Sequence, residues 1–111
     1  MVQMIIKNLD GDTLKSTIFE SEKYFNYSMN NYRDTLSINC NSDDSVVATL
    51  KEIFDFLRDY SEIFKVQVVV DNVVKIEQSY SLSVDTIAFD IYLGGNAKLS
   101  FIKSYNPIVK G

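Results

Sequence analysis

The chain has 111 residues, a formal net charge of −4 and a pI near 4.7, and 46% of its residues are hydrophobic. This composition excludes a disordered chain, and the length favours one hydrophobic core, so we expect a single domain over residues 1–111. The acidic balance disfavours direct nucleic-acid binding, which normally requires a basic surface.

Four strands are expected in the first part of the chain. Asp10-Gly11 lies between two apolar runs and predicts a tight hairpin turn, because such a turn needs positive φ angles. Further along, Leu36, Ile38 and Cys40 alternate with polar residues, which indicates a strand with one buried face. The four strands are placed near residues 2–9, 12–19, 24–29 and 35–40.

One amphipathic helix is expected near 44–61. Apolar residues recur there at the helical period, and charged residues take the opposite face. The apolar stripe consists of Val46, Leu50, Ile53, Leu57 and Tyr60. Asn41, Ser42 or Asp43 is expected to cap the first turn with a side-chain oxygen.

After the helix the period returns to two. Residues 64–70 and 74–77 predict two strands around an Asp71-Asn72 turn, and Gly94-Gly95-Asn96 predicts a further hairpin turn. Tyr80, Leu82 and Val84 share one strand parity, and the apolar residues that follow share the other. The change of parity falls at Asp85-Thr86, where we expect a bulge or a bend.

The order of elements is four strands, one helix and about four strands, joined by short connections. Short connections favour antiparallel pairing, so the expected fold class is α+β, with a mostly antiparallel sheet of about 7–8 strands. One helix cannot cover both faces of a long sheet. The alternatives are a curved sheet around the helix, or a small sandwich or barrel with the helix filling one opening. The C-terminal strand near 98–104 is a candidate edge for pairing with another subunit.

The chain contains one cysteine and no histidine. A Cys–His catalytic pair, an intrachain disulfide and an intrachain zinc site are therefore excluded, and the acids at Asp10-Gly11-Asp12 and Asp43-Asp44 lack the spacing of a calcium loop. We expect a non-enzymatic protein with no catalytic residues, no metal and no cofactor. No apolar stretch approaches the roughly 18 residues of a membrane span, so we expect no membrane contact and a cytoplasmic location, or a virion for a phage structural component.

A stretch rich in tyrosine, asparagine and serine runs from Tyr24 to Asn41. Tyrosine gives a large contact area with few torsions to restrict, and asparagine and serine give adaptable hydrogen bonds. This composition favours a protein interface, and the candidate residues are Tyr24, Tyr27, Asn30, Asn31 and Tyr32. The alternative is that the tyrosines pack at a sheet edge and the asparagines occupy turns.

Three functions remain open from the sequence. The first is a non-enzymatic protein–protein interaction or assembly module, such as a small tail or baseplate component of a phage or prophage, which binds a protein or a second copy of itself. The second is a small acidic phage-type inhibitor, of the anti-CRISPR kind, which binds a host nucleic-acid-binding protein. Its acidic helix face would consist of Glu52, Asp55, Asp59 and Glu62. The third is a small-ligand-binding domain, which requires a sizeable pocket.

Overall fold

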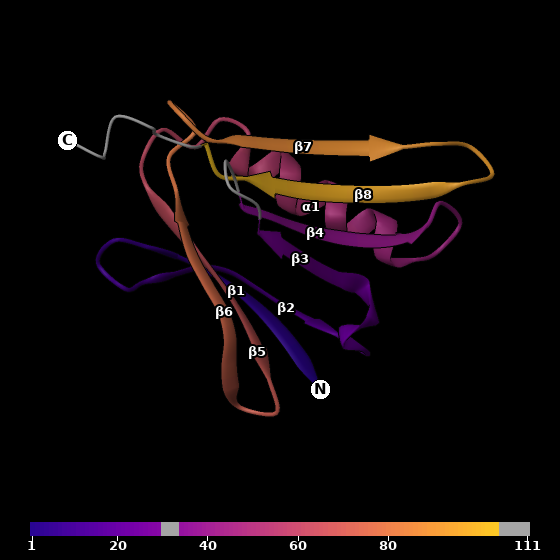
Figure 1. Ribbon diagram of the computed structural model, residues 1–111, viewed down its shortest axis with the longest axis horizontal. Helices are drawn as coiled ribbons and strands as arrows, with labels where there is room; N and C mark the ends of the chain where they lie inside the picture. Colours follow the sequence, from indigo (N-terminus) through magenta and orange to yellow (C-terminus); the bar gives the residue numbers. More distant parts are fainter. Residues whose placement is uncertain (30–33, 105–111) are drawn as a thin grey trace.

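The computed structural model of the protein describes residues 1–29 and 34–104, which form two antiparallel sheets, a short 3₁₀ helix and one α-helix (Figure 1). The strands are β1 (Val2–Asn8), β2 (Thr13–Phe19), β3 (Phe25–Met29), β4 (Asp34–Asn41), β5 (Phe64–Val70), β6 (Val73–Tyr80), β7 (Thr86–Ile91) and β8 (Asn96–Ile102). The helices are η1 (Glu22–Tyr24) and α1 (Val46–Leu57). These elements confirm the α+β class and the order ββββ-α-ββββ.

Each sheet is built from two hairpins, one from each side of α1 in the chain. The first sheet has the strand order β2-β1-β5-β6, and the second sheet has the order β3-β4-β8-β7. The inner strands pair antiparallel, with Val2 opposite Val70 in the first sheet and Cys40 opposite Ala97 in the second. Neither sheet closes on itself, so the structure is an open sandwich and not a barrel.

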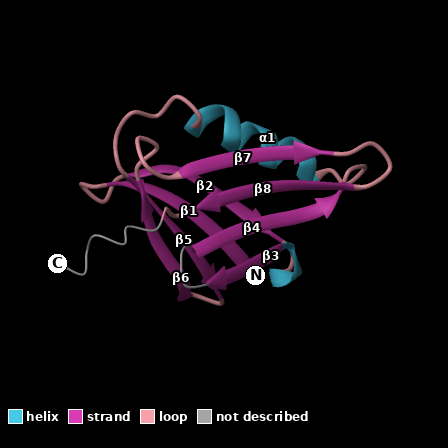
Figure 2. Cartoon of the chain, turned by 45° about the horizontal axis from the view of Figure 1, so that its top comes forward, coloured by secondary structure: helices cyan, strands magenta, loops and turns pink. Residues whose placement is uncertain are grey.

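The hydrophobic core lies between the two sheets and α1. Buried residues alternate with half-buried ones along β5, as the period of a strand requires. The helix packs against β4, β7 and β8 and buries Leu50, Ile53 and Leu57 completely, and each such burial contributes roughly 1.5–3 kcal/mol. On the side of the first sheet, Lys15 Nζ of β2 lies 3.4 Å from Glu52 Oε1 of α1. Figure 2 shows α1 running beside β7, along one side of the sandwich.

The helix is shorter than the expected range 44–61. It begins at Val46, whose amide donates to Asp44 Oδ1 at 2.9 Å, so Asp44 provides the carboxylate at the first turn. The prediction that Asn41, Ser42 or Asp43 would do so is wrong. The helix ends at Leu57, because the Tyr60 amide donates to the Leu57 carbonyl at 2.9 Å in a tighter turn.

Two of the predicted hairpin turns are confirmed by their backbone angles. Asp71 and Asn72 have φ values of 49° and 69°, as a two-residue turn between β5 and β6 requires. Gly11 has a φ of 88° between β1 and β2, which a residue with a side chain adopts rarely. These turns determine which consecutive strands pair within a hairpin. The pairing of one hairpin with another depends on the packing of the core.

Two expectations for the second half are wrong. The C-terminal strand is β8, which lies between β4 and β7, so neither of its edges is free for another subunit. Leu82 and Val84 do not continue a strand, because β6 ends at Tyr80 and the chain turns before β7. The Ser81 carbonyl accepts hydrogen bonds from the Val84 and Asp85 amides, at 3.0 and 2.7 Å, so the change of parity occurs in a turn.

Candidate interaction surface

Within residues 1–29 and 34–104, the open sheets leave four strands with a free edge, and three of these edges carry features that discourage pairing with another chain. In the first sheet, the pairing of β2 with β1 shifts register between Ile6 and Lys7 of β1. The pairing of β6 with β5 shifts register between Val68 and Val69 of β5. In the second sheet, β3 has only 5 residues. The edge of β7 has none of these features, because it pairs with β8 in continuous register over Thr86–Ile91 and contains no lysine, arginine or proline.

Large apolar side chains remain exposed where β7 runs into its hairpin turn. Ile91 is 50% exposed, Tyr92 is 63% exposed and Leu93 is 101% exposed. The turn that follows has Gly94 at a φ of 69°, and its hairpin projects at one end of the second sheet (Figure 1). We define the β7 surface as the free edge of Thr86–Ile91 together with Tyr92 and Leu93.

The backbone of β7 has a defined set of groups facing outward. The Tyr92 amide donates to the Asn96 carbonyl of the β8 side at 3.0 Å. Because hydrogen-bonded and non-hydrogen-bonded pairs alternate in an antiparallel ladder, every second residue before Tyr92 also bonds to β8. The amides and carbonyls of Ile87, Phe89 and Ile91 therefore point toward the free edge.

The α-helix supports this edge from within. Ile87 and Phe89 are partly buried and pack against the core. The Phe89 ring lies 6.0 Å from the Phe54 ring of α1, and the Arg58 guanidinium lies 5.5 Å from the centre of the same Phe54 ring. The β7 strand is thus anchored by its inward side chains, while its outer backbone groups stay accessible.

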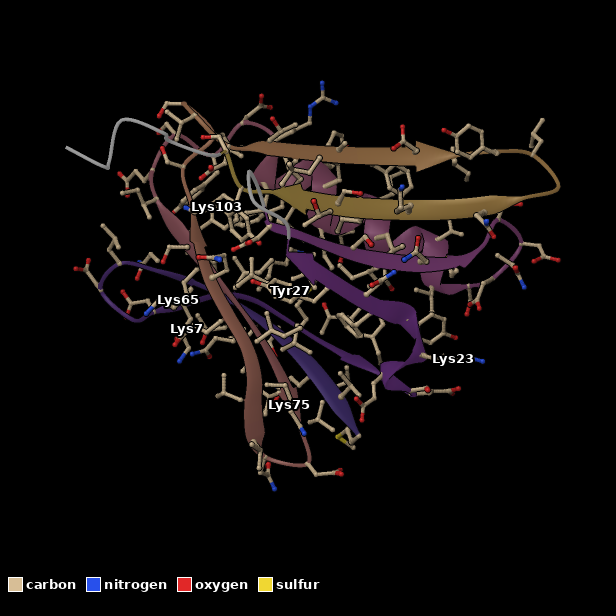
Figure 3. All side chains as sticks on the ribbon, in the orientation of Figure 1. Lys7, Lys23, Tyr27, Lys65, Lys75 and Lys103 are labelled. Atoms are coloured by element: carbon tan, nitrogen blue, oxygen red, sulfur yellow. The ribbon has the colours of Figure 1, made fainter. Side chains whose placement is uncertain are left out.

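A second group of exposed apolar residues lies on the outer face of the first sheet. Ile18 is 61% exposed and Val74 is 50% exposed. This sheet also carries four lysines, and Figure 3 shows three of them, Lys7, Lys65 and Lys75, away from β7. In the register of this sheet, Gln3 and Val69 lie between Ile18 and Val74. This face offers side-chain contacts alone, so it is a weaker candidate than the β7 surface, which adds outward backbone groups.

Tyr24 and Tyr27, two of the three tyrosines predicted from the sequence as an interface, are half-buried. The Tyr24 hydroxyl donates to Asp44 Oδ2 at 3.3 Å, and burial, followed by the Asp44 carboxylate, raises the pKa of Tyr24. Tyr27 packs against the core from β3, and burial, followed by the Asp34 carboxylate, raises its pKa. Asn30, Asn31 and Tyr32 lie outside the described residues. The structure does not bring Tyr24 and Tyr27 into one exposed patch, and their interface role stays a prediction.

The four predicted acidic-face residues are all exposed, but two of them are paired with lysines. Glu52 Oε1 lies 3.4 Å from Lys15 Nζ, and Asp55 Oδ2 lies 2.6 Å from Lys51 Nζ. Asp59 and Glu62 follow at the end of α1 and in the next loop, beside Arg58 in the chain. Positive and negative groups are therefore mixed on this face, and its binding role also stays a prediction.

A hollow of about 440 Å³ lies at the end of the second sheet. It forms because β3 pairs with β4 only as far as Ile38, whereas β4 continues along β8 to Asn41. Its lining residues are Lys23, Tyr24, Asn26, Asn39, Cys40, Asn41, Asp44 and Asn96. Burial, followed by the Asp44 carboxylate, raises the pKa of the Cys40 thiol. The amides offer hydrogen bonds to a polar ligand or partner, and the thiol is in its neutral, less reactive form at neutral pH.

Comparison of the chain with protein family models, with curated proteins and with solved structures finds no match. In residues 1–29 and 34–104, no three carboxylate or thiol groups come together in a way that could hold a metal ion. The described part of the chain also contains no helix with the length and apolar character needed to cross a membrane.

The β7 surface was not among the sites predicted from the sequence. A signal was present, because Ile91, Tyr92 and Leu93 are consecutive large apolar residues immediately before Gly94-Gly95. A half-buried strand needs apolar residues on one face only, so apolar residues on both faces beside a turn indicate an exposed contact.

Proposed function

We propose that the protein is a non-enzymatic interaction or assembly module that binds another protein chain through the β7 surface. The observation that carries this proposal is the exposure of Ile91, Tyr92 and Leu93 at the end of the least protected sheet edge. Tyrosine and large apolar side chains supply much of the binding energy in protein interfaces. An exposed strand edge adds main-chain hydrogen bonds to such a contact.

The β7 surface also explains why binding can be specific. Its backbone groups fix the direction and register of an added strand, and the hairpin tip adds side-chain contacts at one end. The support from Phe54 and the buried side chains of β7 keeps the strand in place before binding. A surface that is already ordered loses less conformational entropy when it binds.

The proposal is tested with a double variant, Tyr92→Ser with Leu93→Ser. We expect it to lose association that the wild type shows, either with its own copies in light scattering or with a protein captured from a lysate of its native host. The matched control is Ile18→Ser with Val74→Ser, which removes exposed apolar side chains from the first sheet and should retain the association. If the double variant associates as the wild type does in both assays, the β7 surface is not the contact.

The two versions of this function differ in the partner. A structural component of a phage particle associates with copies of itself or with other particle proteins, whereas an inhibitor binds one host protein. Light scattering over a range of concentrations separates them, because only the first version gives a discrete oligomer of the protein alone. In both versions the contact is expected at the β7 surface.

A further inference from the structure

We infer that the partner of β7 is the β7 strand of a second copy, paired antiparallel about a two-fold axis at Phe89. This inference rests on the proposed function, since it assumes that the β7 surface is the contact. The two copies would join their second sheets into one continuous eight-stranded sheet, given that each of these sheets has four strands. Both helices α1 would lie on the same face of that sheet.

The register follows from the backbone groups that face outward. In a two-fold pairing centred on Phe89, Phe89 lies opposite Phe89 of the second copy, and Ile87 lies opposite Ile91. These are the residues whose amides and carbonyls point away from β8, so each outward group meets its complement. A centre at Ala88 leaves Ile91 opposite the turn residue Asp85, and a centre at Asp90 leaves Ile87 opposite the hairpin tip. Only the centre at Phe89 uses the whole edge.

The side chains of this register are self-complementary. The inward row of Ile87, Phe89 and Ile91 continues into the same row of the second copy, which covers the exposed half of Ile91. On the outward row, the single charged residue Asp90 lies opposite Ala88 of the second copy, so no like charges face each other. A centre at Asp90 would place the two carboxylates opposite each other, which is unfavourable.

The choice of a second copy as the partner follows from this match. Each copy carries a net charge of −4, so two copies repel each other on average. The β7 edge has one charged side chain among its 6 residues, and the two-fold register separates that charge from its equivalent. Two copies can therefore meet at this edge without placing like charges opposite each other.

Disulfide trapping tests the register directly. We would mix two single variants, Ala88→Cys and Asp90→Cys, under mild oxidation. In the inferred register these residues form a non-hydrogen-bonded pair with Cα atoms about 4.5 Å apart, which a disulfide can bridge. We expect a covalent dimer in the mixture and little in either variant alone. The wild type, whose single thiol Cys40 is buried, is the control for unspecific oxidation.

A pair of variants at Ile91 tests the strand pairing without a covalent bond. Ile91→Pro removes an outward amide, and proline is tolerated where an edge amide faces solvent, so the fold should be retained. We expect a dimer for the wild type and for Ile91→Val, and a monomer for Ile91→Pro, by light scattering at matched concentrations. Circular dichroism and the melting temperature establish that both variants are folded.

The other results have defined meanings. Covalent dimers of Ala88→Cys alone or of Asp90→Cys alone would overturn the register centred on Phe89. Pairing with a second copy would be overturned if the wild type is a monomer and the mixed cysteine variants form no covalent dimer. The proposed function survives that result if the wild type captures a host protein and the Tyr92→Ser, Leu93→Ser variant fails to bind it. Absence of both kinds of association would overturn the proposed function as well.

Discussion

Lys103 and Asp85 form an ion pair that joins the end of β8 to the turn between β6 and β7. Lys103 Nζ lies 3.3 Å from Asp85 Oδ2 and also donates to the Ser79 carbonyl at 2.6 Å. The Asp85 carboxylate, whose side chain is 2% exposed, accepts further hydrogen bonds from the Ser81 and Ser104 amides, both at 2.9 Å. One buried carboxylate therefore connects the two sheets at this end of the molecule.

Replacing this carboxylate should destabilise the protein strongly. Asp85→Ala leaves the Ser81 and Ser104 amides without their acceptor and leaves Lys103 without its counter-charge, so we expect a loss of about 3 kcal/mol in the free energy of unfolding. Urea unfolding measures it, with the exposed Glu62→Ala as a control that should change stability by less than about 0.5 kcal/mol. Equal effects of the two substitutions would contradict the structural role of Asp85.

Two tyrosine-to-phenylalanine substitutions should have opposite effects on stability. Within the described residues, the buried Tyr80 hydroxyl has no hydrogen-bond partner, so Tyr80→Phe should leave stability unchanged or raise it by about 1 kcal/mol. Tyr24→Phe loses the hydrogen bond to Asp44 and should lower stability by about 0.5–1.5 kcal/mol. Urea unfolding of both variants checks the signs, and a clear destabilisation by Tyr80→Phe would show that its hydroxyl has a partner.

Stability should fall at alkaline pH, and Tyr80 should account for part of the fall. Burial, followed by the nearby Tyr27 and Asp85, raises the pKa of Tyr80 far above its ordinary value. Above a pH of about 10, the tyrosine of the unfolded chain loses its proton while the folded one keeps it, so the unfolded state is favoured. Below that pH this contribution is constant. Urea unfolding at a series of pH values should show a shallower alkaline decline for Tyr80→Phe than for the wild type; identical declines would contradict the raised pKa.

Charge introduced into the helix stripe should unfold the protein, whereas charge on its outer side should not. Leu50 is 0% exposed, so Leu50→Asp buries an unpaired carboxylate and should cost more than about 4 kcal/mol. Ala48 is exposed in the first turn of α1, where a negative charge suits the helix dipole, so Ala48→Asp should change stability by less than about 0.5 kcal/mol. Thermal unfolding compares the two, and an unchanged melting temperature for Leu50→Asp would contradict the assignment of the core.

The elements of this fold were predictable because their signals are local. The alternation of Leu36, Ile38 and Cys40 reports the apolar, core-facing side of β4, and the helical spacing of Leu50, Ile53 and Leu57 reports the buried stripe of α1. Both patterns arise from neighbouring residues in the chain. The end of α1 was placed too late because the apolar Tyr60 fits the helical period but packs against Phe64 from a turn.

The strand order and the free edge were not predictable, because they depend on contacts between distant segments. Lysines in the C-terminal strand resembled the defences of an edge. In the structure Lys98 lies between Asn39 and Asp90 on neighbouring strands, and Lys103 pairs with Asp85. The consecutive Ile91, Tyr92 and Leu93 indicate an exposed contact beside a turn, but they do not indicate that β7 is an edge strand. The free edge of β7 follows from the position of β8 inside the sheet.

The pairing of each inner strand with a strand from the other half of the chain has a consequence during synthesis. The hairpins β1–β2 and β3–β4 can form as soon as they leave the ribosome, within microseconds. The inner edges of β1 and β4, however, find their partners only after β5 and β8 have been translated, which takes seconds at roughly 5–20 residues per second. Nascent chains thus expose two unpaired inner edges for far longer than the hairpins need to form. When many ribosomes translate one message, this protein should aggregate more than a protein whose strands pair only with their neighbours in the chain.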